Sequence, residues 1–392
     1  MDILQTFSKS EWKPIQTIDM HTTGEPTRIV VGGCPDLSSH TLLEQRAEAQ
    51  RDHDNIRKRL ILEPRGHFDM YGAILRPETE LTRMNEAHMG VLFLTNDGYS
   101  TMCGHATIAL GRFLFDTHDR ELFPARETIK YDSIANTAIL KLHVPCGLLE
   151  VTVPTLQDGS RSDPERPVSF LSVPSFATGI QVKVAIPKDH RWPELGGRDH
   201  VITDFSYGGA FFCIIPAVEL GFPAGLSDID FDAMNRATKL LKATINANPD
   251  LRHLFQHPEL DDVSFLYSII VVDQTMGKSN GKSGSETGLC YFADQEVDRS
   301  PTGSGVAARA ALAYAKGDLT LGVPWEYHSL VSNATDGKGG FSGTVVEEVG
   351  IQKAFPLVHV KVEGFAYYTG SSTFVVEKDD PLDDGGFVFE KL

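Results

Sequence analysis

The sequence lacks the features that would place this protein in a membrane or on nucleic acid. It contains no run of about 18 apolar residues, so no membrane-spanning helix is expected. Lys and Arg number 36 against 53 Asp and Glu, which gives a formal net charge of -17. Nucleic acid and anionic membrane surfaces attract basic faces, so we expect neither as a partner. A small anionic substrate is not excluded, because it senses only its local pocket.

Cysteine is scarce and widely spaced. The chain has five cysteines and no C-x-x-C pair, which argues against a disulfide framework or a zinc knuckle. The first residues, MDILQTFSKSEWK, show no basic flank followed by an apolar core, so no secretory signal is expected. We therefore expect free thiols and a cytoplasmic location.

The chain of 392 residues is too long for one ordinary core and predicts two domains. Residues 103–109, CGHATIA, resemble residues 302–308, TGSGVAA. Both stretches follow a strand and a polar turn, and both lead into a helix that is small and apolar over most of its circumference. Such a helix is buried. The pattern predicts two strand-rich halves of α/β type, each wrapped around one buried helix, with a polar boundary at 155–167.

Two further segments have a predicted structure but no predicted role. Residues 39–61 are charged with apolar residues at helical spacing, which predicts a surface helix. Residues 276–287, MGKSNGKSGSET, have the composition of a flexible surface loop. Part of this loop, GKSNGKS, is similar to a phosphate-binding loop, but its glycines are one residue too close together and we reject that interpretation.

The two predicted helix starts have groups that could bind a carboxylate and accept a proton. A helix N-terminus has unpaired N–H groups and partial positive charge, so Gly104, His105, Gly303 and Ser304 would hold a carboxylate. The same environment favours the thiolate of Cys103, which suits a general base. The commoner fate of a cysteine is a small buried residue.

Asp298 allows two interpretations, and so do the glycines that follow it. Asp298 could cap its turn, which is the commoner role, or it could hold a substrate ammonium or ring nitrogen together with His105. Residues 303–308 match the dinucleotide fingerprint G-x-G-x-x-A. That match is weak, because the fingerprint follows directly on a buried strand and here Asp-Arg-Ser-Pro intervenes.

Five separated motifs together resemble the proline racemase family, from about residue 17 to about residue 382: DMHTTGEPTRIVVGG, EPRGHFDMYGA, MCGHATIALGRF, DFSYGGAFF and DRSPTGSGVAAR. The resemblance implies the diaminopimelate-epimerase-like fold, in which two pseudo-symmetric α/β domains each wrap a curved sheet around a central helix. The family's active site lies between its two domains. The implied first domain is 15–154 plus 366–392 and carries Cys103, and the second is 155–365.

The resemblance also implies the reaction. Family racemases use two cysteines, one on each substrate face, and the second position is Thr302 in this sequence. A threonine hydroxyl is a poor acid or base at working pH, so the second proton-transfer group is missing. Thr302 would still take part in catalysis at the opposite face of the substrate, where its hydroxyl or a water would donate or relay a hydrogen bond. Members with this Cys/Thr pair are similar to trans-3-hydroxy-L-proline dehydratases, which need one base. Phe292 falls where the family has an aromatic pocket residue.

Other functions remain as alternatives. A proline racemase or hydroxyproline 2-epimerase could work through a water bound at Thr302. A nicotinamide-dependent oxidoreductase would rest on the dinucleotide match alone, and a non-catalytic binding protein would not need the retained Cys103, His105 and Asp298. We expect no cofactor and no metal. The oligomeric state is left open, with a homodimer among the alternatives.

Overall fold

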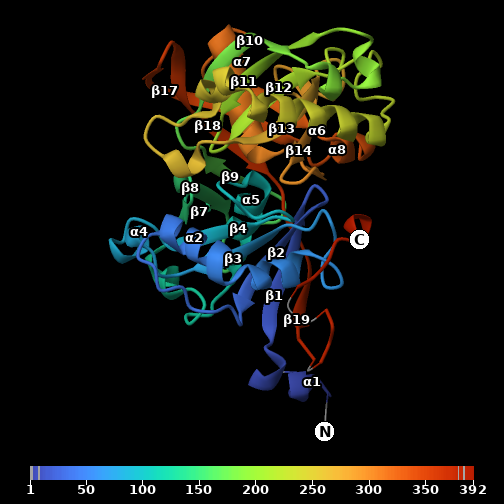
Figure 1. Cartoon of the computed structure of the whole chain (residues 1–392). Helices are drawn as coiled ribbons and strands as arrows, with labels where there is room; N and C mark the ends of the chain where they lie inside the picture. The colour runs from blue at the N-terminus through green and yellow to red at the C-terminus, as the bar shows by residue number, and fades with distance from the viewer. Residues whose placement is uncertain (1–2, 8, 378, 383–384) are drawn as a thin grey trace. The chain divides into compact units, whose positions relative to one another are not determined.

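The computed structural model describes residues 3–7, 9–377, 379–382 and 385–392 (Figure 1). This part of the chain forms two compact units, the first running to Phe170 and resuming at Phe365, the second covering Leu171–Gly364. No helix among the described residues is long and apolar enough to cross a membrane.

The first unit contains five α-helices and ten strands among its described residues. The helices are α1 (Ile3–Phe7), α2 (Leu42–Asp52), α3 (Asp54–Ile61), α4 (Glu80–Arg83) and α5 (Gly104–Asp116). The strands are β1 (Ile15–Thr22), β2 (Glu25–Gly32), β3 (Gly72–Arg76), β4 (Met89–Leu94), β5 (Tyr99–Ser100), β6 (Lys130–Asp132), β7 (Thr137–Val144), β8 (Gly147–Pro154), β19 (Tyr367–Phe374) and β9 (Val168–Leu171), which runs across the change of unit along the chain.

The second unit is built from the remaining elements. Its helices are α6 (Phe231–Ala247), α7 (Gly303–Lys316) and α8 (Leu330–Ala334). Its strands are β10 (Phe176–Ala185), β11 (His200–Tyr207), β12 (Phe211–Pro216), β13 (Leu266–Asp273), β14 (Ser285–Phe292), β15 (Glu296–Val297), β16 (Pro324–His328), β17 (Phe341–Gln352) and β18 (Phe355–Gly364).

The two units repeat one strand order. In the first unit the strands pair in the order β19-β1-β2-β3-β4-β7-β8, with β2–β3 and β4–β7 parallel and the other pairs antiparallel. In the second unit the order is β10-β11-β12-β13-β14-β16-β17, and again only the third and fifth of the six pairs, β12–β13 and β14–β16, are parallel. Short β5 pairs with the end of β4 as β15 does with the end of β14. The repeated order confirms the internal similarity predicted from residues 103–109 and 302–308.

A helix packs at the centre of each unit. Helix α5 contacts β1, β2, β7 and β8, and α7 contacts β10, β11, β12, β17 and β18. Small residues allow these close contacts: a Cβ on Gly111 of α5 would lie 2.7 Å from Val151 Cγ1, and one on Gly305 of α7 would lie 2.7 Å from Ile270 Cδ1. The prediction of two buried helices that begin after residues 103 and 302 is confirmed.

Residues 39–61 differ from the prediction of one surface helix. They form α2 and α3, which are separated at His53, where ψ is 20° and the backbone leaves the helical region. The apolar face of the pair is buried in a core cluster that includes Leu42, Ala49, Ile56 and Leu60. A buried apolar face agrees with the helical spacing of the apolar residues, because a surface helix docks through one apolar stripe.

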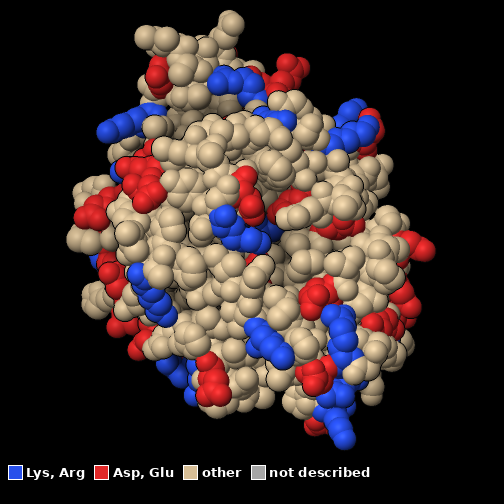
Figure 2. Space-filling model, turned by 90° about the horizontal axis from the view of Figure 1, so that it is seen from above, with Lys and Arg blue, Asp and Glu red and all other residues tan. Residues whose placement is uncertain are grey.

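The predicted loop at 276–287 is shorter in the structure. Its last residues, from Ser285, belong to β14, and the preceding residues form turns. Figure 2 shows basic side chains interspersed with acidic ones on the face that is seen from above. Basic groups on this face therefore have acidic neighbours.

Candidate active site

Cys103 occupies the N-cap of α5. Strand β5 ends at Ser100 and the helix begins at Gly104, so residues 101–103 form the whole connection. The Cys103 backbone is extended (φ -145°, ψ 115°), and its Sγ accepts a hydrogen bond from the Ala106 N–H at 3.3 Å. The sulfur thus takes the place of the usual capping oxygen. Partial positive charge at this helix end favours a thiolate there.

His105 contacts the Cys103 sulfur. The Sγ lies 3.2 Å from the His105 Nδ1 and 3.4 Å from its Nε2. A sulfur this close to both nitrogens lies out of the imidazole plane, so we interpret it as a packing contact between the sulfur and the ring. The edge of the imidazole also meets Tyr71, with ring centroids 4.7 Å apart. The Thr22 hydroxyl donates to the His105 carbonyl at 3.0 Å. The hairpin between β1 and β2 therefore supports the start of α5.

Thr302 occupies the equivalent position before α7 with a different backbone. Its φ of 63° places a β-branched residue in the left-handed region, which such residues rarely adopt. Its side chain makes no cap for α7 and donates instead to Asp298 Oδ2 at 2.8 Å. Asp298 Oδ1 accepts the Ser300 N–H at 2.7 Å, and the Ser300 hydroxyl accepts the Thr302 N–H at 3.1 Å. Asp298 thus organises the turn, and the proton of the Thr302 hydroxyl is already donated.

Cys290 lies beside this turn, and the sequence did not indicate it. Its carbonyl accepts the Asp298 N–H at 3.1 Å, and its Sγ is 2.8 Å from the Ser268 hydroxyl. Burial raises the pKa of the Cys290 thiol to about 12, as does the charge of Asp298, while hydrogen bonds with Ser268 and Thr302 oppose the rise. The thiol is therefore protonated near neutral pH and acts as a hydrogen-bonding neighbour of Thr302.

The fold also positions the other predicted site residues of the second unit. Phe292 ends β14 and stacks on Tyr267, with ring centroids 5.9 Å apart. Gly303 and Ser304 are the first two residues of α7, where backbone N–H groups have no partner within the helix. A Cβ on Gly208, in the turn between β11 and β12, would lie 2.2 Å from the Ser304 carbonyl oxygen. Only a glycine lets this turn pack on the start of α7.

A buried arginine supports the same turn from the other side. Arg309, on α7, donates from Nη2 to the Pro301 carbonyl at 3.0 Å, and its guanidinium lies 4.7 Å from the centre of the Tyr327 ring. A Cβ on Gly288 would lie 2.4 Å from its Nη1, so the side chain depends on that glycine for space. Sequence reasoning took the residues around Arg309 only as part of an apolar helix.

The described structure thus groups the predicted residues by unit. Cys103, Gly104 and His105 lie together at the start of α5. Thr302, Gly303 and Ser304 lie together at the start of α7, with Asp298 in the preceding turn. The supporting residues that sequence reasoning missed are Thr22, Tyr71, Gly208, Cys290 and Arg309. Four of them, all except Cys290, fall inside the family motifs, which did not indicate a role for them.

Burial raises the thiol pKa of the cysteines that lie away from the helix starts. All five cysteines are free, and Cys34, Cys146 and Cys213 each have a thiol pKa raised to about 12 by burial. Their thiols are protonated near neutral pH, which agrees with structural roles. Cys103 is set apart from them by its place at a helix N-terminus.

Comparison with known proteins identifies the family. The family model described as Proline racemase matches residues 17–388. The chain belongs to the proline racemase family. It is 42% identical over 374 residues to a trans-L-3-hydroxyproline dehydratase of Bos taurus, with 95% of this chain and 94% of the relative covered. It is 41% identical over the same length to a trans-3-hydroxy-L-proline dehydratase of Homo sapiens, with the same coverage.

A solved structure has the same fold. The hydroxyproline epimerase of Agrobacterium vitis, crystallised with trans-4-hydroxy-L-proline, superposes with a TM-score of 0.74. The two chains are 20% identical, and the match covers 96% of each. At this identity the likeness concerns the fold. It confirms the predicted α/β class, with two pseudo-symmetric halves that each have a sheet around a central helix.

Proposed function

We propose that this protein is a hydro-lyase that removes water from trans-3-hydroxy-L-proline to give Δ1-pyrroline-2-carboxylate. The observation that carries the proposal is the difference between the two helix starts. Cys103 offers one proton-accepting group at the start of α5, and Thr302 replaces the second with a hydroxyl that donates to Asp298. The relatives at 41–42% identity, which are named as trans-3-hydroxy-L-proline dehydratases, support the same activity.

The reaction follows from one base. The Cys103 thiolate takes the α-proton at C2, and the electrons of that C–H bond form the C2=C3 double bond. The 3-hydroxyl leaves and becomes water on gaining one proton. The enamine product then tautomerises to the imine. Elimination needs no return of a proton to the opposite face of the substrate, so the reaction does not require a second thiol.

The remaining residues bind and stabilise the substrate in this proposal. N–H groups of Gly104, His105, Gly303 and Ser304 stabilise negative charge that spreads into the carboxylate as the α-proton leaves. Asp298 accepts from the ring nitrogen through lone pairs that its contacts with Ser300 and Thr302 leave available. His105 borders the sulfur and suits the return of a proton to the departing hydroxyl.

Two residues have roles beside the chemistry. Phe292 provides an apolar surface for the pyrrolidine ring, held in place by Tyr267. Thr302 keeps Asp298 in position by donating its hydroxyl hydrogen, so it can accept but not simultaneously donate a hydrogen bond to a substrate. This makes Thr302 a positioning residue. Because Thr302 does not return a proton to the substrate, the proposed reaction is elimination and not racemisation.

The cellular setting belongs to the proposal as well. Five free thiols agree with a reducing compartment, and we place the enzyme in the cytoplasm. The chemistry calls for neither a metal nor an organic cofactor. A homodimer is the assembly that we would test first.

The decisive experiment is to incubate the purified protein with trans-3-hydroxy-L-proline and identify the product. We expect formation of pyrroline-2-carboxylate with loss of one water, detected by mass spectrometry. The same protein is incubated with L-proline and with trans-4-hydroxy-L-proline in D₂O, followed by chiral analysis of the recovered amino acids. Rapid inversion of either compound with no dehydration would favour the racemase or epimerase instead.

A further inference from the structure

The second unit contains a cavity that the proposed reaction does not use. It has a volume of about 520 Å³, which is within the range of small-molecule sites. The residues that line it all lie between Asp204 and Tyr327, and those from α7 come from Arg309 to Lys316. Thr302 precedes the other end of that helix. At 1.5 Å per residue, Lys316 lies roughly 20 Å along the axis from Gly303. None of the residues that line the cavity belongs to the turn that carries Thr302.

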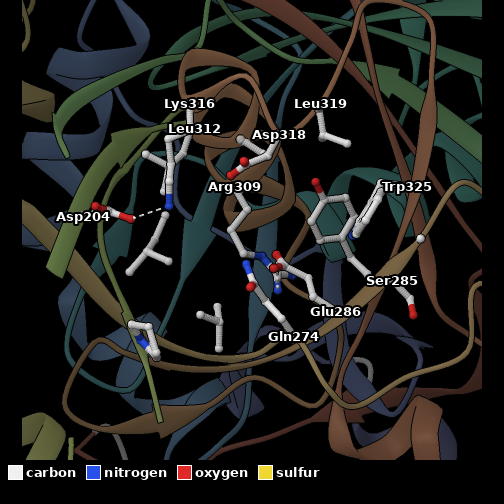
Figure 3. Close-up of a pocket in the computed structure, with 16 residues that line it drawn as sticks. Asp204, Gln274, Ser285, Glu286, Arg309, Leu312, Lys316, Asp318, Leu319 and Trp325 are labelled. Atoms are coloured by element: carbon white, nitrogen blue, oxygen red, sulfur yellow. Dashed lines mark hydrogen bonds and ion pairs between the residues drawn. The ribbon is translucent and has the colours of Figure 1, made fainter. Parts of the chain in front are cut away.

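Two ion pairs leave this cavity with one carboxylate in excess. Lys316 pairs with Asp204 at 3.3 Å, which Figure 3 marks with a dashed line. Arg309 pairs with Glu286 at 3.3 Å. Asp318 also lines the cavity and is exposed, and it has no basic partner in the described part of the chain. Three carboxylates against two basic groups give a formal charge of -1.

Other features of the cavity favour a cation with an apolar body. Trp325 lines the cavity together with Leu312 and Leu319. An indole ring binds cations over its face. The C-terminal half of α7 contributes negative partial charge. Burial raises the pKa of the Glu286 carboxyl, and Arg309 and Lys316 oppose the rise, so a further cation would stabilise its charged form.

The cavity is also connected to the turn before α7. Glu286 pairs with Arg309, and Arg309 donates to the Pro301 carbonyl at 3.0 Å. Pro301 directly precedes Thr302. The Arg309 guanidinium lies against Gly288 and the Tyr327 ring, so this one side chain contacts both Glu286 and the turn.

We infer that this cavity binds a small organic cation with an apolar body and a single positive charge, and that binding is transmitted through Glu286 and Arg309 to the Thr302 turn. The loop that precedes β14 has a role in this site. Gly284 lies against Trp325, where a Cβ would come within 2.6 Å of three ring atoms, and Ser285 and Glu286 follow it. The segment that looked like a plain surface loop therefore shapes a ligand site.

Calorimetric titration with tryptamine tests the binding site. Tryptamine has an indole body and one ammonium group, and indole-3-acetate is its charge-reversed counterpart. We expect tryptamine to bind with a dissociation constant below about 1 mM, which corresponds to about 4 kcal/mol. Indole-3-acetate should bind at least tenfold more weakly. Asp318→Asn should weaken tryptamine binding by up to about fivefold, as for an exposed charge pair. The matched variant Asp228→Asn, on the same unit but outside the cavity, should not weaken it.

The transmission is tested by turnover of trans-3-hydroxy-L-proline at saturating substrate, where competition for the substrate site is removed. Saturating tryptamine should change turnover at least twofold in the wild type and in Asp228→Asn. Absence of tryptamine binding, equal binding of indole-3-acetate, or no effect of Asp318→Asn would overturn the site. Binding without a change in turnover would overturn the transmission. The titration does not need the reaction, so failure of the proposed activity is distinguishable from failure of the site.

Discussion

The starts of α5 and α7 occupy equivalent places in two units of the same strand order, yet they are built differently. Residues 101–103 connect β5 to α5, whereas residues 298–302 connect β15 to α7, so the second turn is two residues longer. Cys103 is extended and caps its own helix, and Thr302 is left-handed and donates away from its helix to Asp298. The longer turn contains Asp298, whose carboxylate accepts a hydrogen bond from the Thr302 hydroxyl. The two halves thus place different side chains before equivalent helices, which supports our proposal that one half transfers the proton and the other binds the substrate.

The hairpins that contact the two helix starts also differ in how they support them. In the first unit, the hairpin between β1 and β2 reaches the His105 carbonyl with the Thr22 hydroxyl. In the second unit, the turn between β11 and β12 reaches the Ser304 carbonyl by the close approach of Gly208. A hydrogen bond holds one helix start, and close packing holds the other.

Replacing Cys103 with Ser gives the largest effect that we expect. It removes the one group at these helix starts that we assign to α-proton removal, and a positioned base contributes about 10²- to 10⁴-fold to rate. We expect turnover of trans-3-hydroxy-L-proline to fall by that factor, measured by the rate of pyrroline-2-carboxylate formation. Cys34→Ser is the matched control, because that thiol lies in the same unit and is protonated near neutral pH. If Cys103→Ser retained near wild-type turnover, the asymmetry between the two halves would not explain the reaction.

Replacing Gly208 with Ala tests the packed support of α7. The new Cβ would lie 2.2 Å from the Ser304 carbonyl oxygen and 2.6 Å from the Ala308 nitrogen, both backbone atoms that cannot move aside cheaply. We expect a loss of about 3 kcal/mol in the free energy of unfolding, at the upper end for overpacking, measured by chemical denaturation.

Gly98→Ala is the control for this variant, in the turn before β5 of the first unit. A Cβ there would meet nothing within 4 Å, so the change should stay within about 0.5 kcal/mol. Equal stability of the two variants would show that the second unit does not depend on close packing at this turn.

The sequence predicted the parts of this comparison that depend on local pattern. Apolar residues over most of the helix circumference predicted burial of α5 and α7, and the similarity of residues 103–109 to 302–308 predicted the repeat that the strand pairing confirms. The family resemblance predicted which residues to compare. Whether Phe292, Asp298 and the helix-start residues bind substrate stays a prediction.

Long-range contacts were beyond the reach of sequence pattern. Cys290 reaches the Thr302 turn because β14 and β15 are adjacent strands, and its sequence neighbours resemble those of any core strand. Arg309 looks like an interruption of an apolar helix until Gly288 and Tyr327 are seen to enclose it. The break between α2 and α3 was missed because His53, where the helix is interrupted, is neither a glycine nor a proline.

Replacing Thr302 with Val gives the smallest effect and sharpens the role of the second half. Valine keeps the shape of threonine and removes the hydroxyl that donates to Asp298 Oδ2 at 2.8 Å. A hydrogen bond to a charged group contributes about 1.5 kcal/mol, which corresponds to roughly a tenfold change. We expect turnover to fall about tenfold through a less well-positioned Asp298, and Thr302→Ser, which keeps the donor, to restore most of it. Steady-state kinetics of the two variants on trans-3-hydroxy-L-proline makes the comparison. Equal turnover of the Val and Ser variants would mean that Asp298 is held without Thr302, and that the second half selects elimination only by lacking a thiol.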